Sequence, residues 1–597
     1  MRICLALLCL IFSSSAFAQD LGWVRAHYVK REAYVRMRDG VRLFTQIYYP
    51  VDSGAHHPML LMRSSYSAAP YGAALNEALG GSFWHRFIRA GYILVFQDVR
   101  GAFMSEGIFE DIRPYTAGAS VDEASDAYDT IDWLVHNVAG NNGRVGALGV
   151  SYPGFYAAMT ALSGHPALKA VSPQAPVTNW FMGDDLHHNG AFCLMDAFSF
   201  YSMMGYPRPS LTTSFHKAFD FRSDDSYDLF LRTGALPHFA TMLGDSVAFW
   251  DSLYAHPNYD AWWAARDDRR YLAGAHPALL VAGGLFDAED LWGTLHVHEA
   301  AGGDFVLGPW YHGQWSSPRP AFGLGHIRFG SNTAAYYQDS IEFPFFQHYL
   351  NDGVDTPARV NVFFTGENEW HKLAAWPPVS TPMPMYLQSF GGLGVSPDSG
   401  YASYVSDPAR PVPYTENVGF DRTREYMDDD QRFAARRPDV LVYETEPLAS
   451  DFRVGGPVQV DLSVSISTTD ADFVVKLVDV YPDDFRDTAV RYPMGGYQML
   501  VRGDIMRGRY RRSFSAPLAF TPGLGTSVPF TLNDVAHVFK KGHRIMVQVQ
   551  SSWFPLFDRN PQRFVDIYHA ADSDFVRSEI RIYGDSRIVL PFIPDLP

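Results

Sequence analysis

The residue types in this sequence that could do covalent chemistry are a serine, an aspartate and a histidine, in the order Ser151, Asp287 and His312. A serine hydroxyl is a weak nucleophile until a histidine takes its proton, and a carboxylate holds that histidine in the required tautomer. Ser151 lies in the segment Gly149-Val-Ser-Tyr-Pro-Gly154, where glycine leaves room for a tight turn and proline suits the first turn of a helix. The amino end of such a helix favours negative charge that develops nearby. We therefore expect Ser151 to act as a nucleophile; taken alone, the segment is equally consistent with a structural turn.

Short apolar runs precede each of these side chains, as expected for the buried strands of a parallel sheet. Longer segments with helical character separate the runs, as between residues 125 and 138. The runs are Pro58–Met62, Tyr92–Phe96, Arg144–Val150, Ala167–Val171, Ala278–Val281 and Asp304–Leu307. Open parallel sheets bind their ligands beyond the carboxyl ends of the strands, which is where all three residues fall. Their order and their placement together predict the catalytic triad of an α/β-hydrolase.

The pattern changes twice along the chain, which indicates separate structural parts. Residues 179–268 are rich in aromatic, Met and His residues with helical spacing, and they predict a helical cap inserted between two strands. After Pro377-Pro378, alternating stretches such as Val458–Ser465, Phe473–Tyr481 and His543–Ser551 predict a β-sandwich. We expect a signal peptide at 1–18, the α/β-hydrolase domain at 19–178 and 269–378, the cap at 179–268, and the sandwich at 379–597.

The first eighteen residues have the pattern of a secretory signal peptide. Arg2 supplies a positive charge, Ile3–Phe12 is apolar, and a small-x-small pattern ends at Ala18. We expect cleavage after Ala18 and a periplasmic or secreted protein without a membrane anchor; a retained anchor is the alternative. Cys193 is the one cysteine that would remain, so no intramolecular disulfide is expected, and its aromatic surroundings predict a buried apolar role.

The composition excludes some classes of protein. The chain has 597 residues, of which 47% are hydrophobic, so it can bury several cores and is not a disordered protein. Its 48 Lys and Arg residues are outnumbered by 65 Asp and Glu residues, which give a formal net charge of −17. This charge argues against nucleic acid as a partner.

Two segments carry a resemblance to a known family. The turn around Ser151 and the segment 284–293 (Gly-Leu-Phe-Asp-Ala-Glu-Asp-Leu-Trp-Gly) are similar to the nucleophile turn and the acid loop of α-amino-acid ester hydrolases. These belong to the cocaine esterase and X-prolyl dipeptidyl peptidase family of α/β-hydrolases. The similarity covers nearly the whole chain after the signal peptide and includes residues 39–42, 97–101, 183–185, 308–312, 428–433 and 551–555. The resemblance implies an α/β-hydrolase domain with an inserted helical cap and a C-terminal β jelly roll, no cofactor, and a homo-oligomer.

The resemblance also implies a role for each residue of the site. Ser151 would be the nucleophile, His312 the general base and Asp287 the residue that orients the base. The oxyanion hole would pair the backbone N–H of Tyr152 with the hydroxyl of Tyr66, two donors that stabilise the charge of the tetrahedral intermediate. The family usually has Thr-Pro or Asn-Pro before this tyrosine, whereas residues 64 and 65 are both serine. The alternative role for Tyr66 is packing at the end of the sheet.

Three acids stand where α-amino-acid ester hydrolases hold the ammonium group of the substrate. Glu289 and Asp290 follow Asp287 by two and three residues, and Asp185 follows Ser151 by 34 residues. Clustered carboxylates repel one another, and a bound cation relieves this repulsion. The same negative field would disfavour a second carboxylate on the acyl side of the substrate. The alternative is that these acids only cap or solvate the starts of helices.

These features predict a serine hydrolase that cleaves small esters or amides of α-amino acids through an acyl-enzyme, and the resemblance implies acyl transfer to β-lactam nuclei. The alternatives are an X-prolyl dipeptidyl peptidase-like peptidase, a general carboxylesterase, and a non-catalytic protein that binds ligands through its jelly roll. No metal is expected, because the adjacent His187 and His188 would diverge on a helix. Residues 428–430, all aspartate, could bind calcium or form a solvated loop. Asp98 and Arg100 are expected to pair below the site.

Overall fold

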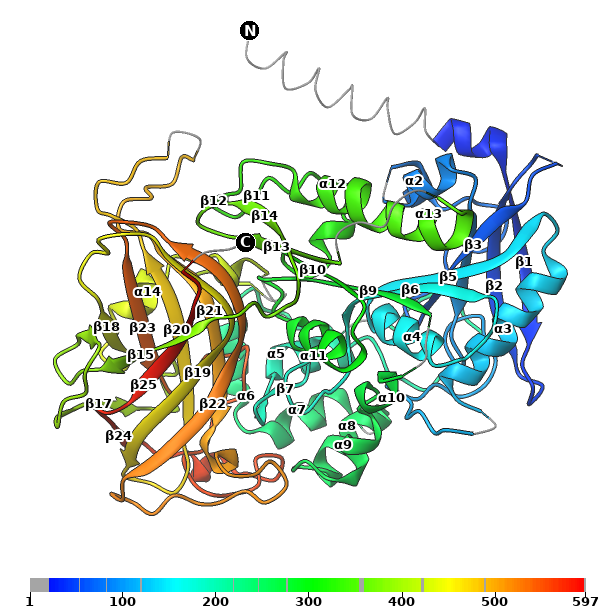
Figure 1. Ribbon diagram of the computed structural model, residues 1–597. Coiled ribbons are helices and arrows are strands. Elements are labelled where there is room, and N and C mark those ends of the chain that lie inside the picture. Colours follow the sequence, from blue (N-terminus) through cyan, green and yellow to red (C-terminus); the bar gives the residue numbers. More distant parts are fainter. Residues whose placement is uncertain are drawn as a thin grey trace, which may run out of the picture.

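The computed structural model describes residues 21–594 except 53, 82, 119–120, 218, 245, 275–276, 354–358, 420–423 and 488–489. The predicted signal peptide, residues 1–18, lies outside the described residues. An α/β part and a β-sandwich lie side by side, on the right and on the left of Figure 1, and a group of helices lies below and between them.

A mixed sheet of ten strands forms the centre of the α/β part, in the order β1-β2-β4-β3-β5-β6-β9-β10-β13-β14. Neighbouring strands from β4 to β13 are parallel, and antiparallel strands flank them at both edges. The six predicted strands are β3, β4, β5, β6, β9 and β10, which confirms that prediction. The bounds are β1 (Tyr28–Arg36), β2 (Arg42–Pro50), β3 (His57–Ser64), β4 (Ile93–Asp98), β5 (Asn141–Ser151), β6 (Leu168–Pro176), β9 (Ala278–Gly284), β10 (Asp304–Gly308), β13 (Val360–Phe364) and β14 (Glu369–Leu373).

Helices cover both faces of this sheet (Figure 1). One apolar core joins the sheet to α2 (Trp84–Arg89), α12 (Thr333–Tyr337) and α13 (Phe343–Asn351). The other core joins it to α3 (Glu123–Asn137), α4 (Tyr152–Ala161) and α11 (Leu291–Ala301). Because both faces are covered, the central parallel strands are apolar on both sides, as their sequences indicate.

A cap of short helices lies between β6 and β9. Its core is aromatic: the ring of Phe198 lies 5.3 Å from that of Phe239 and 6.2 Å from that of Trp250. Cys193 is 2% exposed, which confirms its predicted burial. The cap helices are α5 (Leu194–Tyr201), α6 (Ser226–Thr233), α7 (Leu236–Leu243), α8 (Ala248–Ala255), α9 (Ala261–Ala265) and α10 (Arg269–Leu272).

The expectation of a helix at His187 and His188 is wrong. They form β7 (His187–His188), which pairs with β8 (Ala191–Phe192) in a small hairpin. Asn189 and Gly190, between these strands, both have positive φ and make the turn that a helix could not contain. The two imidazoles bond to different partners, His187 to the Tyr568 hydroxyl and His188 to the Asp504 carboxylate.

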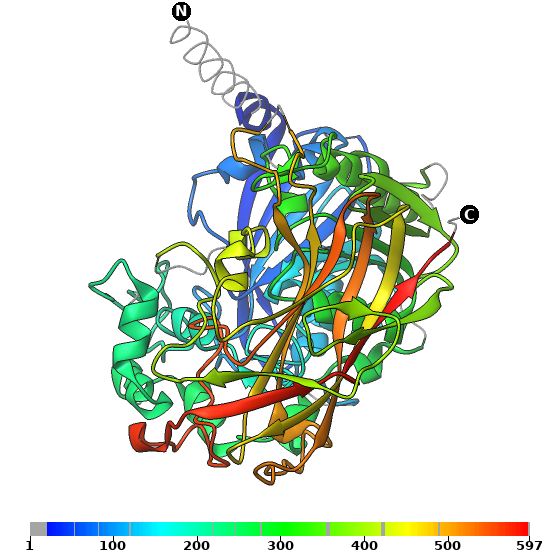
Figure 2. The ribbon, with the colours of Figure 1, turned by 90° about the vertical axis from the view of Figure 1, so that its left-hand side faces the viewer.

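Two antiparallel sheets form the C-terminal β-sandwich (Figure 2), in which β19, β20 and β23 match the predicted strands to within one residue at the ends of β20 and β23 and contain the stretch predicted for β19. The larger sheet contains β15 (Thr381–Leu387), β16 (Leu393–Gly394), β17 (Tyr401–Ser406), β19 (Phe452–Ile466), β22 (Thr526–Phe539), β24 (Ser578–Tyr583) and β25 (Arg587–Phe592). The smaller sheet contains β18 (Leu441–Glu444), β20 (Asp472–Val480), β21 (Gln498–Arg507) and β23 (Arg544–Gln550).

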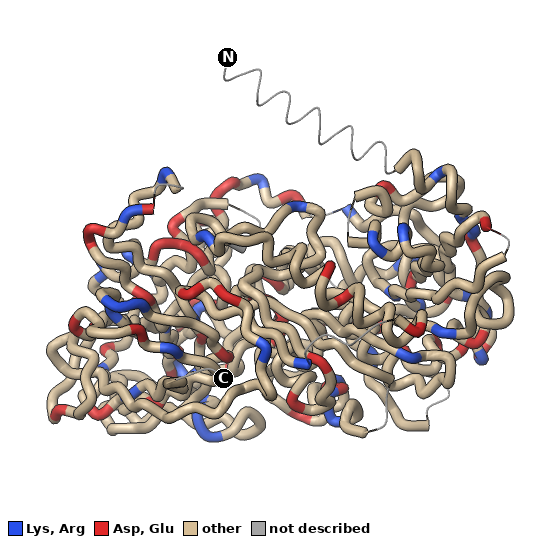
Figure 3. Tube along the Cα trace, turned by 45° about the horizontal axis from the view of Figure 1, so that its top comes forward, with Lys and Arg blue, Asp and Glu red and all other residues tan. Residues whose placement is uncertain are grey.

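The sandwich and the α/β part are joined through backbone hydrogen bonds. Thr365, directly after β13, donates its N–H to the carbonyl of Ala536, and its own carbonyl accepts from the N–H of Val538, at 3.1 and 2.8 Å. Acidic and basic residues are interspersed over both parts, without a basic stripe (Figure 3). Among the described residues, none of the helices has the length and apolar character needed to span a bilayer.

Candidate active site

Ser151 is the last residue of β5, and α4 begins at the next residue. Its φ and ψ are 69° and −129°, a strained conformation for a residue with a side chain. Two glycines make the turn possible. A Cβ on Gly149 would lie 2.1 Å from the carbonyl oxygen of Pro153, and one on Gly154 would lie 2.6 Å from that of Gln174. The turn therefore places Ser151 between the end of the sheet and the start of a helix, as expected for a nucleophile.

Asp287 and His312 lie together beyond the ends of β9 and β10. The Nδ1 of His312 bonds to both oxygens of Asp287, at 2.9 and 3.1 Å, and both side chains are buried. Backbone bonds link the two loops, from the N–H of Leu285 to the Gly308 carbonyl and from the N–H of Phe286 to the Trp310 carbonyl. Hence the acid and the base are held as one rigid unit.

The histidine loop also approaches the turn that carries Ser151. A Cβ on Gly313 would lie 4.0 Å from a methyl group of Val150. The residue after His312 and the residue before Ser151 are therefore neighbours in space. The structure thus brings the predicted triad to the carboxyl edge of the sheet, with the Nε2 of His312 as the ring nitrogen that Asp287 does not bind.

Tyr66 and Tyr152 lie beside this turn. Tyr66 follows β3, and its ring packs edge-on against the rings of Tyr152 at 6.0 Å and of Phe200 at 6.4 Å. Burial and, to a smaller extent, the charges of Asp185, Glu289 and Asp290 raise the pKa of Tyr66 well above its ordinary value. The phenol therefore stays protonated and can donate a hydrogen bond. Tyr152 is the first residue of α4, a position whose N–H has no partner within its own helix.

The predicted carboxylates gather around His312. Glu289 has an oxygen 3.5 Å from the Nε2 of His312, and Asp290 has one 3.9 Å from its Nδ1. Asp185 is tied to the same loop, since its N–H donates to the Glu289 carbonyl at 3.3 Å. Its carboxylate accepts the indole N–H of Trp180 at 3.1 Å. The three acids predicted from spacing are thus neighbours in the structure.

Asp290 is the least satisfied of these acids. Its side chain is fully buried, and neither carboxylate oxygen has a hydrogen-bond partner among the described residues. Burial, followed by the charges of Asp185, Asp184, Asp287 and Glu289, raises its pKa well above the ordinary value. An uncompensated buried carboxylate is costly, and a cation at this point would remove the cost.

The carboxylates of the cluster raise the pKa of His312. Burial by itself lowers its pKa, but the charges of Asp287, Glu289 and Asp185 outweigh burial and raise the pKa to about 9. In the free enzyme at neutral pH the protonated form of His312 therefore predominates, and only the neutral fraction can act as a base. A cation bound among the carboxylates would lower this pKa and restore the neutral imidazole.

Two buried acids near the site have roles that were not predicted from the sequence. The carboxylate of Asp111 accepts the phenol O–H of Tyr152 at 3.1 Å and so fixes the first residue of α4. Asp184 accepts the backbone N–H groups of Thr178, Asn179 and Gly293 at 2.8–2.9 Å, a purely structural role. Asp111 is marked by no motif and no strand end. Asp184 lies in the segment 183–185 that carries the resemblance, but nothing in the sequence indicated its structural role.

The expected pair of Asp98 and Arg100 is wrong. Arg100 instead pairs with Asp126 at 2.6 Å and Asp39 at 2.7 Å. Asp98 accepts the N–H of Ala68 at 2.6 Å, which ties the loop after β3 to the end of β4. β4 ends at Asp98, so Arg100 lies in the turn that follows and not two positions further along the same strand.

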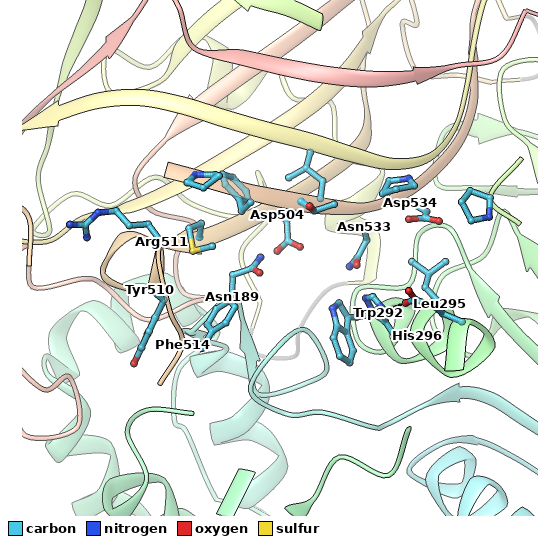
Figure 4. Close-up of a pocket in the computed structure, with 18 of the residues that line it drawn as sticks. Asn189, Trp292, Leu295, His296, Asp504, Tyr510, Arg511, Phe514, Asn533 and Asp534 are labelled. Atoms are coloured by element: carbon cyan, nitrogen blue, oxygen red, sulfur yellow. Dashed lines mark hydrogen bonds and ion pairs between the residues drawn. The ribbon is translucent and has the colours of Figure 1, made fainter. Parts of the chain in front are cut away.

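A cavity of about 780 Å³ lies behind the acid loop, between α11 and strands β21 and β22 (Figure 4). Trp292 and His296 form its wall on the side of α11, and Asp504 and Asp534 face them from the sandwich. A Cβ on Gly183 would lie 2.5 Å from the ring of Trp292, so this indole separates the cavity from the segment that carries Asp185. The cavity is therefore distinct from the carboxylate cluster.

Comparisons with known proteins agree with this architecture. Residues 39–314 match the X-Pro dipeptidyl-peptidase (S15) family, and residues 352–584 match the C-terminal non-catalytic domain of X-Pro dipeptidyl-peptidases. The cocaine esterase of Rhodococcus sp. (strain MB1 Bresler) is 31% identical, over 95% of this chain and 98% of that protein.

Two solved structures resemble the whole chain. An α-amino acid ester hydrolase labelled with selenomethionine is 37% identical with a TM-score of 0.89, over 95% of this chain and 97% of that one. An aminopeptidase from the marine sediment archaeon Thaumarchaeota archaeon has the same identity and TM-score, over 95% and 96%. The family and the fold class predicted from the sequence are thereby confirmed. The chain belongs to the family of the cocaine esterase and the X-Pro dipeptidyl peptidases, and it is a serine hydrolase.

Proposed function

We propose that this protein hydrolyses esters or amides of α-amino acids, and that it binds the α-ammonium group of the substrate among Asp185, Glu289 and Asp290. The observation that carries the proposal is the buried carboxylate of Asp290, which has no hydrogen-bond partner among the described residues. It lies within a cluster of acids around His312, which is 3.5 Å from Glu289 and 3.9 Å from Asp290. An ammonium group supplies the missing positive charge and donors in one step.

Catalysis follows from the roles of the three triad residues. The hydroxyl oxygen of Ser151 attacks the acyl carbon while the Nε2 of His312 takes its proton. The phenol of Tyr66 and the N–H of Tyr152 hold the oxyanion. The bond to the leaving group then breaks, and the leaving group takes the proton from His312.

Release of the acyl group repeats these steps with a new nucleophile. Water gives its proton to His312 and attacks the acyl-enzyme, which releases the amino acid and returns the proton to Ser151. An amine in place of water would yield an amide, so transfer to amines, including β-lactam nuclei, is part of the proposal.

The bound ammonium has a second effect in this scheme. Its positive charge lies beside the acids that keep His312 protonated, and it lowers the pKa of that imidazole. Substrates with an α-amino group therefore help to generate the neutral His312, the base that takes the proton of Ser151.

The test compares phenylglycine methyl ester with phenylacetic acid methyl ester, which lacks the α-amino group. A paired ammonium contributes about 2–3 kcal/mol, so kcat/KM should favour the amino ester by roughly 30- to 150-fold in the wild type. The preference should collapse in Asp185→Asn and persist in Glu299→Gln, a surface acid on α11. Equal rates for the two esters in the wild type would leave a general carboxylesterase.

An aminopeptidase is the second candidate, favoured by the 37% identity to the archaeal aminopeptidase. The same carboxylates would then hold the amino terminus of a peptide. Release of the first residue or the first dipeptide from unblocked peptides, and its loss on N-acetylation, would identify this activity.

Export is also a proposal, which rests on the leader pattern of residues 1–18. It is tested by sequencing the amino terminus of the protein recovered from the periplasm or the medium, which should begin at Gln19. Assembly into a homo-oligomer is the remaining proposal, and light scattering of the purified protein tests it.

A further inference from the structure

One buried arginine of the β-sandwich reaches into the catalytic part of the molecule. Arg502 lies on β21 and is 3% exposed. Its Nη2 donates to the carbonyl oxygen of Leu285 at 2.5 Å and to that of Asp534, on β22, at 3.0 Å. Leu285 stands two residues before Asp287 in the acid loop. A residue of the domain that contains no triad member therefore touches the loop that carries the proposed catalytic acid.

Irregular pairing on two strands, one in each sheet of the sandwich, directs this side chain. On β21, Arg502 pairs with Leu477 but Leu500 pairs with Val478, so Val501 is an extra residue that forms a β-bulge. On β22, residues 533 and 534 together stand opposite the single residue 457 of β19, which is a second bulge. Bulges redirect side chains and are common beside functional sites. Here they turn Arg502 toward the α/β part and present the Asp534 carbonyl to it.

Both backbone polar groups of Leu285 are hydrogen-bonded. Its N–H donates to the Gly308 carbonyl of the histidine strand at 2.7 Å, and its carbonyl accepts from Arg502. The next two N–H groups of the loop are also bonded, that of Phe286 to Trp310 and that of Asp287 to Gly284. Of these loop contacts, the one from Arg502 is the only one made by a side chain of the sandwich.

The charge of Arg502 is unusual for a buried arginine. Among the described residues it forms no ion pair, and its Nε is buried without a hydrogen-bond partner. Burial lowers its pKa to about 10, while the charges of Asp504, Asp534 and Asp287 favour the cation. Arg502 is therefore still a cation at neutral pH. An apolar residue of the same volume would avoid this desolvation, so packing alone does not explain an arginine here.

We propose that Arg502 is a positioning residue for catalysis: through the Leu285 carbonyl it holds the acid loop at the distance at which Asp287 orients His312. The sandwich thereby contributes to the rate of the chemical step. The inference rests on the proposed role of Asp287 and is independent of the preference for α-amino groups.

The first test is Arg502→Met, assayed per active site after titration with a serine-directed phosphonate. Misplacement of an orienting group by a fraction of an ångström lowers the rate of the chemical step, so we expect kcat to fall about 10- to 100-fold with KM within about two-fold. Arg502→Lys, which keeps a cation and a donor, should retain an intermediate rate, and it replaces the Met variant if that variant does not fold. An unchanged kcat in a folded variant overturns the proposal.

Arg507 provides the matched control on the same strand. It is also buried, but among the described residues its guanidinium binds only Asp472 and Asp558, both within the sandwich. Arg507→Met should lower the melting temperature and leave kcat per titrated site unchanged. An equal loss of kcat in both variants would mean that any damage to the sandwich slows the enzyme, which contradicts a specific role for Arg502.

A double mutant separates this inference from the proposed function. If Arg502 acts through Asp287, the effects of Arg502→Met and Asp287→Asn on kcat are less than additive in the double variant. Fully additive effects overturn the positioning role. If Asp287→Asn by itself leaves kcat unchanged, the assignment of the catalytic acid fails, whatever Arg502 does.

Discussion

A carboxylate oxygen of Glu289 lies beside the Nε2 of His312, the ring nitrogen that is proposed to take the proton of Ser151. At 3.5 Å this carboxylate favours the protonated imidazole, which is the inactive form of the base. The arrangement makes chemical sense when the substrate itself brings a positive charge.

The pH dependence of the reaction tests this effect of Glu289 on the protonation of His312. Because the neutral form of His312 is needed, kcat/KM for the uncharged phenylacetic acid methyl ester should rise with pH up to about 9. Glu289→Gln removes an anion that raises the pKa of His312, so this rise should move to lower pH, by about one pH unit. Glu299→Gln should leave it in place. A shift to higher pH in Glu289→Gln would contradict the electrostatic account.

Residues with a fixed spacing to a motif were predictable, and residues brought in by long-range packing were not. Asp185, Glu289 and Asp290 were identified because the resemblance to α-amino-acid ester hydrolases implies carboxylates at fixed distances along the chain from Ser151 and Asp287. Their roles stay predictions until the variants are measured. Arg502 has no such marker, because a one-residue bulge aims it and bulges leave no clear trace in the sequence.

At the scale of elements, the turn between β5 and α4 tolerates no side chain at its glycines. A Cβ on Gly154 would meet two backbone atoms of β6, the Gln174 oxygen at 2.6 Å and the Pro176 Cα at 2.9 Å. Gly154→Ala should therefore lower the free energy of unfolding by about 1–3 kcal/mol, measured by urea denaturation. Gly525→Ala, where nothing lies within 4 Å, should change it by less than about 0.5 kcal/mol. Equal stability of the two variants would show that the turn can relax.

The interior strands were predictable because burial on both faces gives continuous apolar runs. The outer strands β1, β2, β13 and β14 were not predicted, since they lie outside the βα rhythm, and the edge strands β1 and β14 are only partly buried. The hairpin of His187 and His188 was mistaken for helix because aromatic and histidine residues at helical spacing surround it, while two positive-φ residues decide the local structure.

At the scale of the whole molecule, buried acids make the stability depend on pH. Burial raises the pKa of Glu342 and of Asp111 to about 7, and that of Asp98 and Asp534 to about 6. Between about pH 4 and 7 the folded state therefore binds more protons than the unfolded state, and stability falls as the pH rises.

Glu342→Gln tests this account. The carboxyl of Glu342 accepts from the Nε2 of Gln174 at 2.7 Å, a bond that a glutamine oxygen can also accept. The variant should lose less stability than the wild type between pH 5 and pH 8, by up to about 3 kcal/mol. Urea unfolding at the two pH values measures the difference. A loss as large as in the wild type would place the effect elsewhere.

The contact between Arg502 and Leu285 can form only late in the synthesis of the chain. The two residues are 217 positions apart, so at roughly 5–20 residues per second Leu285 is made about 10–40 s before Arg502. During this interval the nascent chain already contains Ser151, and later His312, but lacks the side chain that clamps the acid loop. If Arg502 positions the acid loop as proposed, the hydrolase reaches its full rate only after this residue has been made and β21 has formed.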